Sequence, residues 1–170
     1  MSKTYFTDNQ IDTISTRSID NLRHRVIMSE KMEAFKRKLI EKRKAKNETF
    51  LAENQLRENV TLLNSGIQYE VLEEGFGNVH PSVRDWVTAH YHGTLIDGKV
   101  FDSSVDRNKS ATFKLNNLIK AWQEVVPLMV AGDKWRVVVP PSMGYGERQE
   151  GKIPSHSILI FELELIAIGR

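Results

Sequence analysis

The first third of the chain has the spacing of a helix. From Ser29 to Asn59 there is no glycine or proline, and Glu, Lys, Arg, Ala and Leu dominate. Because these residues favour helices, one long helix is predicted there, starting at Ser29 or a few residues earlier. Residues 1–25 are rich in Ser, Thr, Asp and Asn, which predicts a mobile arm or one short helix in front of it.

The predicted helix carries a short apolar stripe. Its members are spaced by four, three and four positions, which places them on one helical face: Met28, Met32, Phe35 and Leu39. The next position of the same rhythm is Lys42, whose charge ends the stripe. Two interpretations are open. The stripe is either the seam of a homodimer formed through residues 28–39, or a face that packs against the chain's own N-terminal arm.

After Gly66 the apolar residues change from helical spacing to alternation, which predicts strands. The predicted strands are 67–72, 85–95, 99–101, 112–115, 134–139 and 157–168. Between two of them, Asp97-Gly98 is a tight hairpin signal. We expect these segments to form a twisted antiparallel sheet of about five strands.

One short helix interrupts the strands. Its apolar residues recur on one helical face: Leu118, Ile119, Trp122, Val125, Val126 and Met129. Pro127 is expected to distort its last turn. Since one helix covers one face of a sheet, the core should lie there, and solvent should meet the other face, where Glu162 and Glu164 fall. The predicted fold is α+β: a five-stranded antiparallel sheet around one short helix, preceded by the long helix, with domains at 1–64 and 65–170.

The composition excludes some classes of protein and of chemistry but does not indicate a function. Of 170 residues, 40% are apolar and 27% charged, as in ordinary globular proteins, and the absence of cysteine excludes disulfides and thiolate chemistry. No run of 18 apolar residues predicts a membrane span. The polar first residues show no secretory signal, so a cytoplasmic location is expected, or a periplasmic one if the N-terminus was trimmed.

Positive charge is concentrated in the first 60 residues, which hold 13 Lys and Arg against 9 Asp and Glu. The densest run, KRKLIEKRKAK at 36–46, could suggest a nucleic-acid partner. No aromatic residue interrupts the run for base stacking, and acidic residues are interspersed with it. A solvated helix face is the favoured interpretation, and nucleic-acid binding is not expected.

The usual signatures of catalysis are absent from the sequence. There is no Gly-x-Ser-x-Gly, no glycine-rich phosphate loop and no His-Glu-x-x-His. His90 and His92 share one strand face, but no third ligand follows by spacing, so no metal site is predicted. If the chain is an enzyme, its chemistry requires neither a nucleophile nor a cofactor.

Several short motifs resemble the FK506-binding (FKBP) family of peptidyl-prolyl isomerases. They follow in the family's order: HYHGTL at 90–95, DGKVFDSS at 97–104, DRNK at 106–109, AW at 121–122, GYG at 144–146 and LIFELEL at 159–165. The preceding ETFLAEN at 48–54 and LNSGIQY at 63–69 resemble the bacterial branch typified by the macrophage infectivity potentiator. That branch carries a long helix before the isomerase domain and often dimerises through its N-terminal part.

The resemblance implies an apolar pocket between the short helix and the sheet. It assigns catalytic positions to Tyr91, Phe101, Asp102, Trp122, Tyr145 and Phe161, and binding of substrate or inhibitor to Leu118, Ile119 and Ile153. Trp122 would form the floor under a proline ring. Tyr145 and the backbone of Ile153 would hold the flanking peptide by hydrogen bonds. Macrolides such as FK506 and rapamycin would be inhibitors.

The function implied is acceleration of Xaa-Pro bond rotation during protein folding, with proline-containing polypeptides as substrates. The alternative is a chaperone module that holds unfolded chains or a partner, with little turnover. For Asp102 three roles are open: orienting Tyr91 within the pocket, responding to the change in polarity around the twisted carbonyl, or a structural ion pair with Arg107. Ala111 and Met143 stand where many relatives have aromatic residues, and the loop ERQEGK at 147–152 is polar and charged. These changes are expected to alter the pocket rim.

Overall fold

The long helix extends further towards the N-terminus than its sequence indicates. In this computed structural model, which describes residues 8–169 and side chains from Ser18 onward, α1 runs from Asp8–Asn54. The expected arm or separate short helix is therefore wrong for residues 8–25, and the remainder of that prediction, 1–7, lies outside the described residues. No glycine or proline interrupts the chain before Gly66, so nothing in these polar residues breaks the helix.

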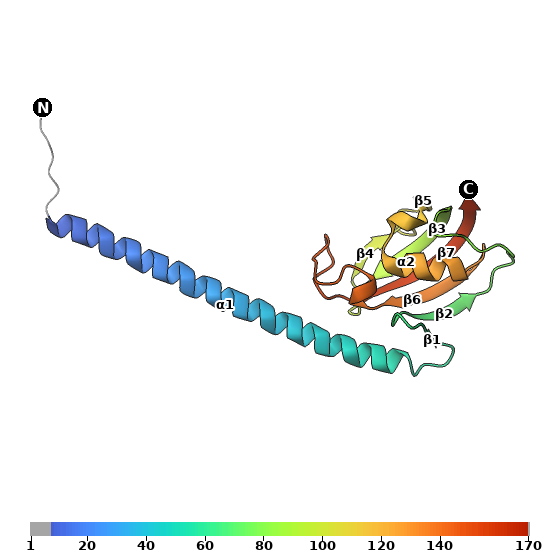
Figure 1. Cartoon of the computed structure of the whole chain (residues 1–170), viewed down its shortest axis with the longest axis horizontal. Coiled ribbons are helices and arrows are strands. Elements are labelled where there is room, and N and C mark those ends of the chain that lie inside the picture. The colour runs from blue at the N-terminus through green and yellow to red at the C-terminus, as the bar shows by residue number, and fades with distance from the viewer. Residues whose placement is uncertain (1–7, 170) are drawn as a thin grey trace, which may run out of the picture. The chain divides into compact units, whose positions relative to one another are not determined.

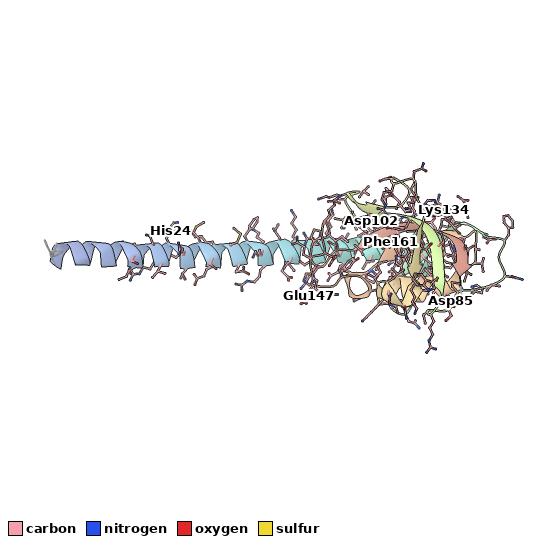
Figure 2. All side chains as sticks on the ribbon, turned by 90° about the horizontal axis from the view of Figure 1, so that it is seen from above. His24, Asp85, Asp102, Lys134, Glu147 and Phe161 are labelled. Carbon is pink, nitrogen blue, oxygen red and sulfur yellow. The ribbon has the colours of Figure 1, made fainter. Side chains whose placement is uncertain are left out.

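By its contacts the chain divides into two compact units, Met1–Lys42 and Arg43–Arg170. The apolar stripe lies in the first unit, and its members are about half exposed: Met28 49%, Met32 52%, Phe35 58% and Leu39 45%. Side chains around His24 likewise project away from the helix (Figure 2). Because the residues from Asp8 onward continue the same helix, packing of the stripe on an arm formed by them is excluded.

The second unit is built on one antiparallel sheet (Figure 1). Its strands are β1 (Thr61–Leu62), β2 (Gln68–Glu73), β3 (Trp86–Thr94), β4 (Val100–Ser103), β5 (Ala111–Lys114), β6 (Lys134–Val139) and β7 (Leu159–Gly169). They are ordered β1-β2-β6-β7-β3-β4, and β5 also pairs with β3. The predicted fold class is confirmed, with seven strands instead of about five. The strand β1, which was not predicted, has only two residues, too few to show an alternating pattern in the sequence.

The short helix covers one face of this sheet (Figure 1). It is α2 (Lys120–Val125), preceded by a 3-10 turn, Leu115–Asn117, and followed by another, Val126–Leu128. The second turn contains Pro127, as the expected distortion requires. Trp122 and Val125 are buried beneath α2, and the alternate residues of β3 and β7 are buried opposite them. The core thus lies between α2 and the sheet, and Glu162 is exposed on the other face.

The end of α1 belongs to the second unit and is tied to the sheet. The buried Asn54 donates from Nδ2 to Gln68 Oε1 at 2.7 Å, and its Oδ1 accepts from Arg136 at 2.9 Å. The helix ends at this residue, not at Asn59 as expected. Asn59 itself has φ of +67°, a left-handed conformation that a helix cannot contain. The functional boundary expected after residue 64 stays a prediction.

Among the described helices, none combines enough length with enough apolar character to span a membrane.

Candidate active site

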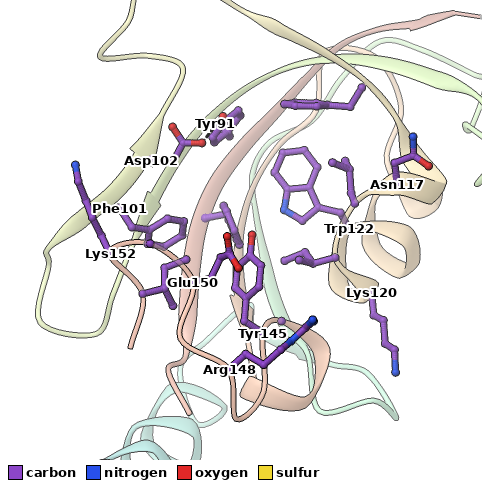
Figure 3. Close-up of a pocket in the computed structure, with 17 residues that line it drawn as sticks. Tyr91, Phe101, Asp102, Asn117, Lys120, Trp122, Tyr145, Arg148, Glu150 and Lys152 are labelled. Carbon is purple, nitrogen blue, oxygen red and sulfur yellow. Dashed lines mark hydrogen bonds between the residues drawn. The ribbon is translucent and has the colours of Figure 1, made fainter. Parts of the chain in front are cut away.

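A cavity of about 700 Å³ opens between α2, the sheet and the β6–β7 loop (Figure 3). Every residue that the sequence assigned to the site lines it: Tyr91, Phe101, Asp102, Leu118, Ile119, Trp122, Tyr145, Ile153 and Phe161. These residues come from β3, β4, β7, α2 and two loops, so only the folded chain brings them together. Their roles in binding and turnover stay predictions.

Trp122 is the centre of the aromatic lining. Its ring meets Tyr91, Phe113 and Phe161 edge-on, with centroids 5.6, 5.9 and 5.6 Å away. Phe101 extends the cluster through an edge contact with Phe161 at 5.5 Å. Perpendicular arrangements of this kind are favoured between aromatic rings, and they hold each ring in one orientation. The cavity is therefore walled by fixed apolar surfaces.

The sequence positions these rings through strand alternation and one glycine. Tyr91 is on the inward face of β3, and Phe161 is on the inward face of β7, where it pairs in register with Gly93. A Cβ atom at Gly93 would lie 2.6 Å from Phe101 Cζ. Only glycine lets the Phe101 ring cross β3 at this point and reach the cavity.

Leu118 and Ile119 enter the site because the chain is extended just before α2. Both have ψ above 150°, so neither is part of the helix. The side chain of Gln123 donates to the backbone oxygen of Leu118 at 2.7 Å, and the N–H of Trp122 bonds Ile119 O at 3.0 Å. These bonds fix the extended backbone of the two residues just before α2, where both line the cavity.

A polar triad closes one side of the cavity. The Tyr91 hydroxyl donates to Asp102 Oδ2 at 2.6 Å, and Arg107 bonds Asp102 Oδ1 and, at 2.9 Å, the Tyr91 hydroxyl. The Arg107 guanidinium also lies 5.8 Å from the centre of the Tyr91 ring. Asp102 thus bonds both Tyr91 and Arg107, while its part in turnover stays a prediction.

The electrostatics of the triad keep its groups in one ionisation state. Burial raises the pKa of Tyr91, and its hydrogen bond to Asp102 raises that pKa further. Burial alone would raise the pKa of Asp102, but hydrogen bonds from Tyr91 and Arg107, together with the Arg107 charge, lower it below the usual value. At neutral pH the site therefore holds a carboxylate and a neutral phenol.

Tyr145 and Ile153 come from the long loop between β6 and β7. Burial raises the pKa of Tyr145, and among the described residues nothing bonds its hydroxyl, which is free to meet a ligand in the cavity. Ile153 donates its N–H to Glu150 O at 2.8 Å and accepts from Glu150 N at 2.9 Å. Of the two backbone groups of Ile153, only the carbonyl keeps a second lone pair for a substrate.

Comparison with known proteins agrees with this site. The family model described as FKBP-type peptidyl-prolyl cis-trans isomerase matches residues 77–166, and the model of the domain amino-terminal to it matches residues 2–71. The chain belongs to the FKBP-type peptidyl-prolyl cis-trans isomerase family. The first match contains every residue that lines the cavity, so we refer to this cavity as the FKBP-type pocket.

The relatives include bacterial proteins of the predicted branch. The isomerase FkpA from Aeromonas hydrophila is 46% identical over 74% of this chain and 46% of its own length. The outer membrane protein MIP from Legionella longbeachae is 40% identical over 85% of this chain and 61% of its own. The chain thus spans about half to three fifths of these relatives. The crystal structure of FkpA from Escherichia coli superposes with a TM-score of 0.78 at 31% identity, covering 98% of this chain and 75% of that one.

Several residues of the FKBP-type pocket were not predicted. Phe113 is the main apolar one, and its position two residues after Ala111 on β5 was the signal that could have found it. Asn117 and Lys120 were also missed, whereas Arg148, Glu150 and Lys152 belong to the charged loop 147–152 that was expected at the rim. Ala111 and Met143 do not line the cavity, so of the expected changes at the rim only the charged loop 147–152 reaches the pocket.

His90 and His92 lie away from the FKBP-type pocket, on the opposite face of β3. Their Nδ1 atoms bond the hydroxyls of Ser104 and Ser103 at 3.0 and 2.9 Å. In the described part of the chain, no three His, Cys, Asp or Glu residues are grouped closely enough to hold a metal ion.

Proposed function

We propose that this chain accelerates the cis–trans rotation of Xaa-Pro bonds by holding the proline ring over Trp122. The observation that carries the proposal is the FKBP-type pocket itself, whose aromatic walls converge on one indole ring. Family membership supports the same reaction. The polypeptide substrate would be an exposed proline-containing segment of a folding chain.

The physical basis is the difference in polarity between the planar and the twisted amide. Rotation must cross a barrier of roughly 18–20 kcal/mol, because resonance gives the C–N bond partial double-bond character. That resonance also makes the planar amide polar, and the polarity is lost at the twisted transition state. Moving the bond from water into an apolar pocket costs the planar form more than the twisted one, which lowers the barrier.

The polar groups of the pocket would orient the peptide around this bond. The Tyr145 hydroxyl would donate to a carbonyl of the substrate, and the Ile153 carbonyl would accept an N–H. Asp102 and Arg107 would hold Tyr91 against Trp122 and keep the wall rigid. No proton is transferred and no covalent intermediate forms.

A protease-coupled assay on a short Xaa-Pro peptide tests the proposal. The full chain at micromolar concentration should accelerate the slow phase, which without enzyme takes on the order of tens to hundreds of seconds. FK506 or rapamycin, proposed as ligands of the same pocket, should suppress that acceleration. A slow phase equal to the spontaneous rate would refute the proposal.

The alternative, a module that holds unfolded chains with little turnover, is favoured by the exposed apolar stripe of α1. We propose that this stripe suppresses aggregation of a denatured test protein. The double variant Met32→Glu/Phe35→Glu should lose the suppression and retain peptide isomerisation. Loss of both activities would show that they share one surface and would exclude a separable holding site.

A homodimer through residues 28–39 is a further proposal. A second stripe on the same helix, Ile19, Leu22 and Val26, is also about half exposed, at 48%, 59% and 56%. A long helix with apolar residues at such spacing gains stability by pairing with another copy. Sedimentation should report a dimer for the full chain and a monomer for Leu39→Glu. Leu56→Glu, at a residue that is 83% exposed, is the matched control and should leave the mass unchanged.

The cellular compartment of the protein can also be tested. The first residues predicted the cytoplasm, whereas one relative is named an outer membrane protein. We propose that the chain acts on polypeptides that have not finished folding. Cell fractionation with a C-terminal tag decides between the compartments, and recovery in the periplasmic fraction would contradict the cytoplasmic prediction.

A further inference from the structure

The last turns of α1 bond to the loop that carries the pocket tyrosine. Asn47 donates from Nδ2 to the backbone oxygen of His156 at 2.7 Å, and Arg43 donates to the backbone oxygen of Ser155 at 2.8 Å. The two side chains are one helical turn apart on α1, and the two carbonyls are consecutive in the loop. All four residues belong to the second unit. Helix and loop are therefore joined by a matched pair of hydrogen bonds.

These bonds hold the loop where its backbone most requires support. His156 has φ of +57°, a left-handed conformation that a residue with a Cβ adopts at a cost. In that conformation its N–H points to Gly146 O at 2.7 Å, and Gly146 directly follows Tyr145. Three hydrogen bonds thus meet at residues 155 and 156, two from α1 and one to the neighbour of Tyr145.

Asn47 is built into the protein interior for this contact. Only 5% of its surface is exposed, although asparagine is usually a surface residue. Its Oδ1 has no hydrogen-bond partner among the described atoms, so the contact with the loop is what its amide provides. Burying an amide oxygen without a hydrogen-bond partner costs stability. That cost indicates that the hydrogen bond made by the Asn47 amide nitrogen is useful.

We infer that Asn47 and Arg43 are positioning residues for the isomerase site, acting through His156 and Gly146 on the Tyr145 hydroxyl. This inference rests on the proposed function. It assigns part of the helix before the sheet to the catalytic unit, although neither residue lines the cavity. Loss of either bond frees the Ser155–His156 backbone, and Tyr145 then samples orientations in which its hydroxyl does not meet the substrate.

Full-chain variants test the inference. Asn47→Ala should lower kcat/KM for an Xaa-Pro peptide about fivefold, the effect of one lost hydrogen bond. Glu48→Ala is the control, since Glu48 is the exposed neighbour on the same helix and the same alanine is introduced. If Asn47→Ala does not fold, Arg43→Ala replaces it, and Arg43→Lys should restore activity because it keeps a donor. An unchanged kcat/KM in the alanine variants would overturn the inference.

A double-mutant cycle separates positioning from general stability. In a Tyr145→Phe background, Asn47→Ala should change kcat/KM by less than about twofold, because the hydroxyl that it positions is already gone. The full fivefold loss in that background would mean that Asn47 acts elsewhere, and would overturn the inference.

Amide hydrogen exchange tests the contact between α1 and the loop without measuring turnover. The His156 N–H should exchange faster in Asn47→Ala than in Glu48→Ala, since its bond to Gly146 is no longer held. Unchanged exchange at His156 would overturn the inference even in an active enzyme. A wild-type chain without isomerase activity would instead refute the proposed function, while faster exchange in Asn47→Ala would still support the contact.

Discussion

Two groups of apolar side chains in this molecule differ in what they touch. Around Trp122 the rings of Tyr91, Phe113 and Phe161 meet edge-on within the chain, and Trp122 is only 6% exposed. Along α1 the stripe from Met28 to Leu39 is about half exposed. Both groups show helical or strand spacing in the sequence, yet only the first contains buried side chains.

The pocket is a structure that a single chain forms by itself, whereas the exposed stripe needs a partner to be covered. The pocket is complete within the second unit, so its geometry predicts a reaction and the residues that carry it. The stripe has apolar area that water does not favour, so it predicts contact with another molecule without naming it. Variants in the two regions should therefore affect different measurements.

The largest effect is expected at the centre of the pocket. Trp122→Ala should lower the free energy of unfolding by about 3–5 kcal/mol, because it removes a buried indole and leaves a cavity. Peptide isomerisation should fall to near the spontaneous rate. Trp86→Ala is the matched control, since Trp86 is 47% exposed at the start of β3, and it should change stability by less than about 0.5 kcal/mol. Equal effects of the two variants, measured by urea unfolding, would contradict the role given to Trp122.

A smaller effect is expected at the pocket rim. Tyr145→Phe removes only a hydroxyl that bonds no described residue, so the melting temperature should stay unchanged. Its kcat/KM should fall about fivefold because one hydrogen bond to the substrate is lost. Full retention of kcat/KM would show that the hydroxyl does not meet the peptide.

The polar triad of Tyr91, Asp102 and Arg107 should make the stability of the fold depend on pH. The pKa of Asp102 is lower in the folded chain than its usual value of 3.8, so its ion pair stabilises the fold above that pH and the stabilisation is lost as the pH falls through the folded pKa. Arg107→Ala should lower the melting temperature at pH 7, and the deficit should shrink as the pH is brought below the folded pKa. Lys109→Ala, an exposed residue of the same loop, should show no such convergence. A deficit that is independent of pH would contradict the pairing.

Turnover itself should be insensitive to pH. In the pocket, the pKa of Asp102 lies below 3.8 and those of Tyr91 and Tyr145 lie above 10.0, and no histidine is among the lining residues. We expect a flat profile of kcat/KM between about pH 5 and pH 9. A bell-shaped profile in a peptide assay would indicate a proton transfer that this site does not provide.

The smallest effect on turnover is expected in the stripe. Phe35→Glu changes a residue of the first unit that is 58% exposed, and it should leave kcat/KM for a short peptide unchanged. In the pocket, even the milder substitution Phe161→Leu should lower kcat/KM. If Phe35→Glu also impaired peptide turnover, the two regions would not be independent.

The strands and the pocket could be predicted because alternation and motif order are local. Tyr91 and Phe161 lie on the inward faces that the alternation of β3 and β7 indicated. The full extent of α1 could not be predicted, because Ser, Thr and Asp are common in both arms and helix starts. The strand β1 was also missed, since the pairing of a two-residue strand depends on its neighbour and not on its own pattern.

The contacts that shape the site were the hardest to foresee. Nothing in the spacing of Asn47 and His156 shows that they meet, because they lie 109 positions apart. The engagement of the Ile153 N–H by Glu150 is likewise a property of the folded loop. Long-range hydrogen bonds of this kind have no periodicity, so only the assembled fold contains them.

The pocket around Trp122 is proposed to accelerate rotation about Xaa-Pro bonds. Exchange spectroscopy on one Xaa-Pro peptide, with the full chain present in catalytic amount, measures that rotation directly and needs no coupling protease. We expect cis–trans exchange peaks to appear with the wild-type chain, to persist with Trp86→Ala and to vanish with Trp122→Ala or with FK506. Exchange at the spontaneous rate with the folded wild-type chain would contradict the proposal.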